Sequence, residues 1–106
     1  MLFRSDGLKT FGTYWCIYPD WQSEAGRWCT FQVNQQIQIP PGLDNQASMI
    51  SVHCGKTTTR ATLFVYDGTR PGTTKVGTVV CTKQGETKYS GVRYNDVASS
   101  GKVFAY

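Results

Sequence analysis

The two halves of this chain carry the same short pattern, and this internal repeat restricts the fold more than any other feature of the sequence. The stretch "LDNQASMISVH" (43–53) aligns with "YNDVASSGKVF" (94–104) at a shift of 51 residues. Each stretch has an acid/amide pair, a two-residue spacer, a hydroxyl residue and then a strand pattern. Upstream, "WCIY" (15–18) aligns with "LFVY" (63–66) at a shift of 48. We therefore expect a single domain, 1–106, built from two units of about 50 residues, repeat one at about 12–55 and repeat two at about 60–106.

Strand-forming residues dominate both units. Thr occurs 13 times in 106 residues and Leu only 4 times, a bias that favours strands over helices. Each unit divides into four strand signals. The signals fall at 12–19, 28–39 (a long run) and 49–54 in repeat one, and near 61–66, 75–82, 89–93 and 101–106 in repeat two. The predicted fold is all-β, an eight-stranded antiparallel sandwich with Greek-key connections.

Residue parity predicts which strand side chains face the core. In the run 28–39, one parity is expected to point inward: Cys29, Phe31, Val33, Ile37 and Ile39. That assignment leaves Trp28 exposed. On the last strand of repeat one, Ile50, Val52 and Cys54 are expected to point inward. Gly26 is expected to supply a positive φ in the turn "DWQSEAGR" (20–27).

Charge is divided unevenly between the units. Residues 1–53 hold three Lys/Arg and four Asp/Glu, a net charge of −1, whereas residues 54–106 hold eight and three, a net charge of +5. A basic half suits an anionic partner such as a phosphate group, an acidic glycan or a microbial surface. The alternative is a solvated face that keeps a small protein soluble. Nucleic acid is not expected as a partner, because the basic residues are scattered and no single-stranded-binding motif occurs.

The chain contains four cysteines, Cys16, Cys29, Cys54 and Cys81. An even number of cysteines in a short chain predicts two disulfides and a secreted, extracellular protein. The spacings of 13, 25 and 27 residues include no Cys-x-x-Cys pair, and there is one His, so a zinc site is not expected. Four buried reduced thiols are the alternative.

Membrane-spanning and catalytic functions find little support. No apolar run approaches the roughly 20 residues of a membrane-spanning helix, and residues 1–7 are too short and polar for a signal peptide, which is either absent or already removed. His53 stands between apolar residue types and is expected to be inert. Asp20 and Glu24 match the pattern of a glycosidase carboxylate pair, but such residues are common in any exposed turn. We expect no enzymatic activity.

The repeated acid/amide and hydroxyl pattern resembles that of the βγ-crystallin superfamily. Its form, Asn/Asp, Asn/Asp, two variable residues, Ser/Thr and Ser, occurs once in each half. An aromatic strand that ends in Tyr18, followed by a polar turn with Gly26, precedes the first copy. The resemblance covers roughly residues 12–106, although the corresponding loop of repeat two is longer and rebuilt around Arg70-Pro71-Gly72. It implies two Greek-key motifs in a small secreted microbial protein of βγ-crystallin type.

By this resemblance the two segments, which we call clamps (44–49 and 95–100), would bind one or two calcium ions. Calcium takes six to eight oxygen ligands at about 2.3–2.6 Å, and each site would draw ligands from both clamps. The ligands would be Asn45, Ser99 and Val97 for one site, and Asp96, Ser48 and Gln46 for the other. Three residues would support the clamp turns: Asp44, Asn95 and Ser100. A backbone carbonyl from 21–24 or from 68–69 would complete each site.

The chain departs from the family pattern at Met49, which stands where the second hydroxyl of the first clamp belongs. Asn45 supplies a neutral amide, so its site should be the weaker one, and calcium binding is expected in the micromolar to millimolar range. The alternative is that Asn, Asp and Ser only stabilise turns through hydrogen bonds to the backbone.

The resemblance also bears on the disulfides and on other functions. In the implied fold Cys16 and Cys29 lie on neighbouring strands of a hairpin, which favours Cys16–Cys29 with Cys54–Cys81. The second choice is Cys16–Cys54 with Cys29–Cys81. Two further functions suit the same fold. One is a killer-toxin-like antifungal or antimicrobial protein, with Trp15, Trp21 and Trp28 as contacts. The other is a secreted protease inhibitor whose binding loop is Arg70, Pro71 and Gly72 within "DGTRPGTTK" (67–75).

Overall fold

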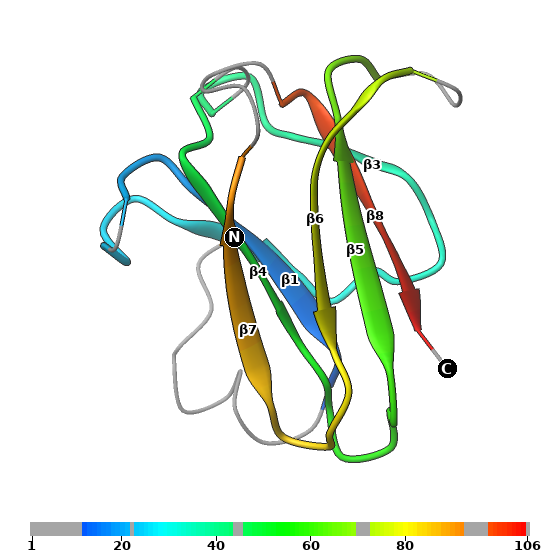
Figure 1. The fold of residues 1–106 in the computed structure, drawn as a ribbon. Helices are drawn as coiled ribbons and strands as arrows, with labels where there is room; N and C mark the ends of the chain where they lie inside the picture. Colours follow the sequence, from blue (N-terminus) through cyan, green and yellow to red (C-terminus); the bar gives the residue numbers. More distant parts are fainter. Residues whose placement is uncertain (1–11, 22, 44–45, 70–72, 93–97, 106) are drawn as a thin grey trace.

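The fold is all-β. The computed structural model describes residues 12–21, 23–43, 46–69, 73–92 and 98–105, and these contain strands but no helix (Figure 1). The described segments contain eight strands: β1 (Tyr14–Tyr18), β2 (Trp28–Thr30), β3 (Ile37–Gln38), β4 (Met49–His53), β5 (Ala61–Tyr66), β6 (Lys75–Cys81), β7 (Thr87–Gly91) and β8 (Ser100–Ala105). Each lies within or close to a segment predicted from the sequence.

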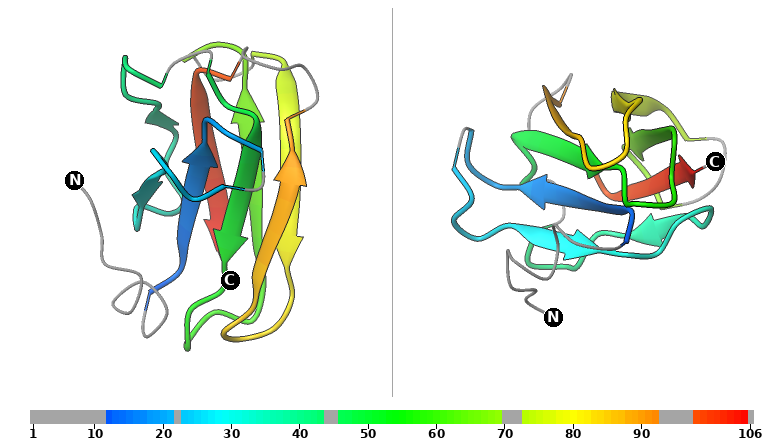
Figure 2. Two further views of the ribbon diagram at one scale, coloured as in Figure 1. Left: turned by 90° about the vertical axis from the view of Figure 1, so that its left-hand side faces the viewer. Right: turned by 90° about the horizontal axis from the view of Figure 1, so that it is seen from below.

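The strands form two four-stranded antiparallel sheets. One has the order β2-β1-β4-β7, and the other has the order β3-β8-β5-β6. Three strands of each sheet come from one half of the chain, while the third strand of each half joins the sheet of the other half. Strands β6 and β7 lie side by side where the two sheets meet along one edge (Figure 2).

The two halves use the same pairing scheme. The first strand of each half pairs with the second and the fourth strands, β1 with β2 and β4, and β5 with β6 and β8. In the first half Tyr18 is opposite Met49, and in the second half Tyr66 is opposite Ser100. Tyr18 and Tyr66 correspond in the sequence repeat, as do Met49 and Ser100, so the internal repeat is a repeat of structure.

The main core lies between the sheets. The predicted inward residues Ile50, Val52 and Cys54 are all fully buried there. Trp15 is also fully buried and its indole packs against Gly101 of β8, where a Cβ would come within 2.6 Å of the ring. Trp15 therefore cannot contact a partner, in contrast to the role suggested for it by the antimicrobial interpretation.

The run 28–39 is not one strand with one inward parity. It divides into β2 and β3, which belong to different sheets, and Asn34 between them has a φ of 59°. The break reverses the expected orientation: Trp28 packs against the core, 5.2 Å from the Trp15 ring, while Phe31 is 36% exposed. The parity prediction is confirmed for Val33, Ile37 and Ile39, which lie in or against the main core. It was wrong in β2, because the crossing between sheets gives β2 and β3 opposite inward parities.

A second buried cluster covers the outer face of the first sheet. It consists of Tyr14, Cys16, Tyr18, Cys29 and Met49. Because both faces of this sheet are covered near its centre, all five residues of β1 and all five of β4 are buried. Simple alternation of buried and exposed residues is therefore absent from these two strands.

Two disulfides connect the strands, Cys16–Cys29 and Cys54–Cys81, and the preferred pairing is confirmed. Cys16 is directly opposite Cys29 in the β1–β2 pair, and Cys54–Cys81 links the end of the first half to β6. Two disulfides in a chain of this size are typical of extracellular proteins. The described segments include no helix long and apolar enough to cross a membrane.

Candidate functional site

The clamps lie partly within the described structure. Asp44 and Asn45 of the first clamp, and Asn95, Asp96 and Val97 of the second, are outside the described residues. Of the residues expected to bind calcium or support the turns, the structure describes Gln46, Ser48, Ser99 and Ser100. Gln46 is exposed, Ser48 is half-buried, and Ser99 and Ser100 are buried.

Ser48 and Ser99 occupy equivalent positions in the two halves. The Ser48 backbone N–H donates to the Tyr18 carbonyl at 2.8 Å, and the Ser99 N–H donates to the Tyr66 carbonyl at 2.7 Å. Each bond fastens the end of a clamp to the last residue of the first strand in its own half. The hydroxyl residue of each clamp is thereby held beside the turn that follows that strand.

A second pair of hydrogen bonds links each clamp to the other half of the chain. The Ile39 N–H donates to the Ser99 carbonyl at 2.9 Å, and the Val92 N–H approaches the Ser48 carbonyl at 3.4 Å. The connection from Ile39 to Ser48 therefore starts beside Ser99, while the connection from Val92 to Ser99 starts beside Ser48. Each connection therefore begins beside the residue at which the other one ends.

The hydroxyl groups reach backbone carbonyls of the first turn in each half. The Ser48 hydroxyl donates to the Pro19 carbonyl at 2.8 Å, and the Ser100 hydroxyl donates to the Gly68 carbonyl at 2.5 Å. The carbonyl beside Ser48 is thus that of Pro19 rather than one from 21–24. In the second half the expected Gly68 carbonyl is engaged by Ser100.

The described clamp groups offer oxygen donors without a carboxylate cluster. Among residues 12–21, 23–43, 46–69, 73–92 and 98–105, no group of three or more His, Cys, Asp and Glu side chains could hold a metal ion. The described ligand groups at the clamps are hydroxyl and carbonyl oxygens, the types that hard cations such as calcium and magnesium prefer.

The predicted protease-binding loop is closed at its base. Arg70, Pro71 and Gly72 lie outside the described residues. The Asp67 N–H donates to the Thr74 carbonyl at 3.0 Å, and the Thr74 N–H donates to an Asp67 carboxylate oxygen at 3.2 Å. These bonds fix the two ends of the loop next to each other.

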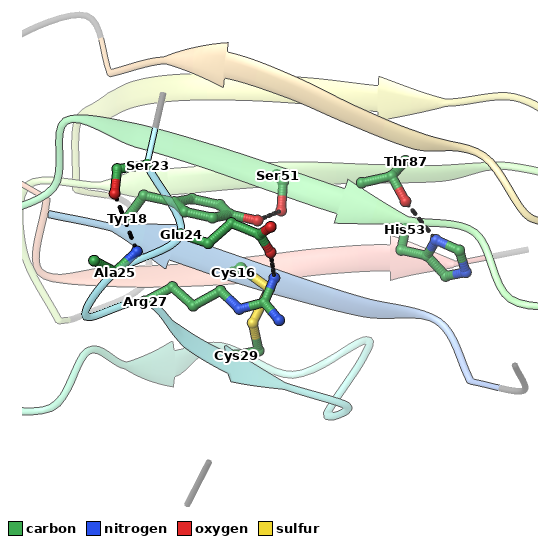
Figure 3. Close-up of polar contacts among 10 residues, drawn as sticks. All are labelled: Cys16, Tyr18, Ser23, Glu24, Ala25, Arg27, Cys29, Ser51, His53 and Thr87. Carbon is green, nitrogen blue, oxygen red and sulfur yellow. Dashed lines mark hydrogen bonds and ion pairs between the residues drawn. A yellow bond between two sulfur atoms is a disulfide. The ribbon is translucent and has the colours of Figure 1, made fainter. Parts of the chain in front are cut away.

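His53 is buried on the outer face of the first sheet. Its ring stacks on Tyr14 with centroids 4.7 Å apart, and its Nδ1 lies 2.6 Å from the Thr87 hydroxyl (Figure 3). Burial lowers the pKa of His53 and raises the pKa of Tyr14. Both groups are therefore held in their neutral forms at neutral pH.

The outer face of the first sheet also holds contacts that the sequence patterns did not predict. The hydroxyls of Tyr18 and Ser51, both buried, share a hydrogen bond of 2.9 Å, and Arg27 pairs with Glu24 near the Cys16–Cys29 disulfide (Figure 3). Next to them Tyr89 of β7 is 54% exposed. The residue spacing in β7 could have indicated its orientation, but not the neighbours that β1 and β4 bring to it.

Two lysines of the basic half lie over aromatic rings of their own sheet, the one formed by β3, β8, β5 and β6. The Lys75 ammonium is 4.0 Å from the centre of the Phe64 ring, and the Lys102 ammonium is 4.7 Å from the centre of the Phe104 ring. The two rings meet edge to face with centroids 5.8 Å apart. Part of the charge expected to attract an anionic partner is thus arranged on rings of the protein itself.

Comparison with protein-family models, with curated proteins and with solved structures found no match to this chain.

Proposed function

We propose that this chain is a non-enzymatic, disulfide-stabilised, extracellular protein of βγ-crystallin type that binds calcium weakly through its two clamps. The third strand of each half, β3 or β7, joins the sheet of the other half, and we call this the exchange of third strands. It supports the Greek-key part of the proposal. In each half the second strand pairs with the first, the third joins the other sheet, and the fourth returns beside the first. A fourth strand that returns beside the first is the mark of a Greek key.

The reciprocal bonding of Ser48 and Ser99 carries the calcium proposal. A site that takes ligands from both clamps requires the two clamps to lie close together. The bonds from Ile39 to Ser99 and from Val92 to Ser48 support this, because each holds a residue that precedes one clamp beside the end of the other. Two oxygens that bind one calcium ion at 2.3–2.6 Å lie roughly 3 Å apart. The Ser48 hydroxyl and the Pro19 carbonyl are separated by 2.8 Å.

Thermal unfolding of the non-reduced protein tests the proposal, first in EGTA and then in about 10 mM calcium, with magnesium as the control ion. For a dissociation constant near 100 μM, linkage gives about 2.7 kcal/mol of stabilisation. In a domain of this size the melting temperature should rise by roughly 10–20 °C. An absence of any calcium-selective rise would contradict the proposal and leave the clamps as turn-stabilising segments.

Three variants assign the effect to the clamps. Asp96→Ala and Ser48→Ala should each reduce the calcium-dependent rise, because each removes an oxygen ligand. Glu86→Gln is the matched control, since it removes a carboxylate at the other end of β7, where the Glu86 side chain accepts a hydrogen bond from Thr82 N–H. An equal rise in all three variants would place the ion elsewhere.

A further inference from the structure

An open hollow lies on the outer face of the sheet formed by β2, β1, β4 and β7. Its volume is about 510 Å³, and its lining residues are Trp21, Ser23, Glu24, Met49 and Tyr89. Trp21 is 56% exposed and Tyr89 is 54% exposed, the highest values for large apolar side chains in the described parts of the chain. Two aromatic rings left open to water around one concavity are typical of a binding site.

Each of the two rings contacts the sheet on one side. The indole of Trp21 lies against Gly91 of β7, where a Cβ would be only 3.3 Å from the ring. The Tyr89 ring lies 6.0 Å from the ring of Tyr18, which is itself fixed by the hydrogen bond to Ser51. A preformed site avoids the entropy cost of ordering side chains when a ligand binds.

The repeat does not predict the hollow, because the residues at the corresponding place in the second half make polar contacts with one another. In the second half, the Gln36 amide donates to the Ser100 hydroxyl at 2.9 Å and approaches the Thr69 carbonyl at 3.4 Å. These polar contacts join the turn after β5 to β8. The first half has Met49 at the position of Ser100, and its side chain lines the hollow instead. The residue that breaks the clamp pattern is therefore part of this second site.

The polar groups at the hollow define the chemistry of the ligand. Glu24 offers a carboxylate, Ser23 a hydroxyl and Tyr89 a phenol, and Glu24 is the one charged residue in the described lining. Its partner in the ion pair is Arg27. The hollow therefore has no excess positive charge that would attract an anionic polymer. The Glu24 carboxylate can accept hydrogen bonds from sugar hydroxyls, and the Ser23 and Tyr89 hydroxyls can both donate and accept them.

We propose that the hollow binds a neutral polysaccharide. A hexose ring has an apolar face of C–H groups and a rim of hydroxyls, which matches flat aromatic faces next to polar side chains. One sugar ring packs on the indole of Trp21, and the chain continues past Tyr89, since an open hollow accepts a segment of a polymer. This site is separate from the proposed calcium sites and does not depend on them.

Titration with neutral glycans tests the proposal, with laminarin, yeast mannan, cellohexaose and chitohexaose as probes and heparin as the anionic comparison. All titrations contain EGTA, so the result is independent of calcium. Calorimetry gives affinity. A ligand-induced change in tryptophan fluorescence should come mainly from Trp21, because Trp15 is fully buried and Trp28 is half-buried. We expect at least one neutral glycan to bind and to shift the emission to shorter wavelength.

Three variants localise the binding. Trp21→Ala and Tyr89→Ala should each weaken it by about tenfold or more. Phe31→Ala, which removes an aromatic that is 36% exposed but does not line the hollow, should leave it within about twofold. Thermal unfolding checks that each variant is folded, and Trp21→Phe should retain part of the affinity if Trp21→Ala unfolds.

Three results would overturn the proposal. The first is that no neutral glycan binds at about 10 mM sugar units. The second is unchanged affinity in folded Trp21→Ala, which would put the binding surface elsewhere. The third is that heparin binds most tightly, which would identify the basic second half as the carbohydrate-binding region.

Discussion

Asn34 allows the chain to pass from one sheet to the other. Its φ of 59° lies in the left-handed region, which Asn tolerates better than most residues with a side chain. Its backbone N–H donates to the Val103 carbonyl at 2.6 Å, and its side-chain oxygen accepts from the Ala105 N–H at 3.1 Å. The turn is thus fastened to β8, the strand beside which β3 lies.

His53 shows at the same scale how a polar residue is accommodated on a buried strand. It is 3% exposed, with Thr87 at its Nδ1 and Tyr14 across its face. Because burial lowers its pKa in the folded protein, the unfolded chain takes up a proton at a higher pH than the folded protein does.

The lowered pKa of His53 predicts that stability falls in mild acid. Above the unfolded value of about 6.5 both states are neutral at this residue, and its contribution is fully present. As pH falls below about 6.5 toward the folded pKa, the free energy of unfolding should decrease by up to about 1.4 kcal/mol per pH unit. Urea unfolding from pH 8 to pH 5 measures this slope, and His53→Gln should flatten it. An unchanged slope in that variant would assign it to other groups.

At the scale of elements, the disulfides act on different parts of the fold. Cys16–Cys29 joins two adjacent strands on the outer face of the first sheet, within the cluster that includes Tyr14 and Tyr18. Cys54–Cys81 lies in the main core and connects the two halves. The sequence separations are 13 and 27 residues, so the second bridge restricts the unfolded chain more.

Removal of either disulfide should cost about 2–5 kcal/mol of unfolding free energy. We expect Cys54→Ala/Cys81→Ala to cost about 0.6 kcal/mol more than Cys16→Ala/Cys29→Ala, because loop entropy grows with the logarithm of loop length. Chemical denaturation of the two double variants measures the difference. All four cysteines are buried, so each pair serves as a packing control for the other. A larger loss for Cys16–Cys29 would mean that packing in the outer cluster outweighs chain entropy.

At the scale of the whole molecule, the exchange of β3 and β7 makes the two halves depend on each other. Each half on its own lacks the strand that completes its sheet, and the core between the sheets draws residues from both halves. A half would leave much of this apolar surface in water, and a domain of about 50 residues can bury little surface by itself.

Separate fragments 1–57 and 58–106 should therefore remain unfolded. Mixing them under oxidising conditions should restore the fold, with Cys54–Cys81 joining the fragments covalently. Amide dispersion in NMR spectra measures folding, and non-reducing electrophoresis detects the link. A Cys81→Ala version of the second fragment is the control for the covalent link. Independent folding of either fragment would contradict the dependence inferred from the strand exchange.

The sequence by itself determined much of the architecture. Strand-forming residues and the turns between them located the strands. The repeat aligned Tyr18 with Tyr66 and Ser48 with Ser99, which the structure places in equivalent hydrogen bonds. These features are local, because strand pattern and turn chemistry depend on neighbouring residues. The sheet that each strand joins is not local. Parity therefore failed for Trp28 and Phe31, because these residues lie before the crossing at Asn34, in or next to β2, which belongs to a different sheet from β3.

Only the tertiary structure decided what lies on the outer face of the first sheet. Trp21, Met49 and Tyr89 are separated by 28 and 40 residues, and they line one hollow because β7 from the second half pairs with β4. Likewise, the bonds of Ile39 to Ser99 and of Val92 to Ser48 arise from the exchange of third strands. Sequence periodicity fixes the direction of a side chain relative to its own strand, whereas a site formed by distant segments depends on which strands pair.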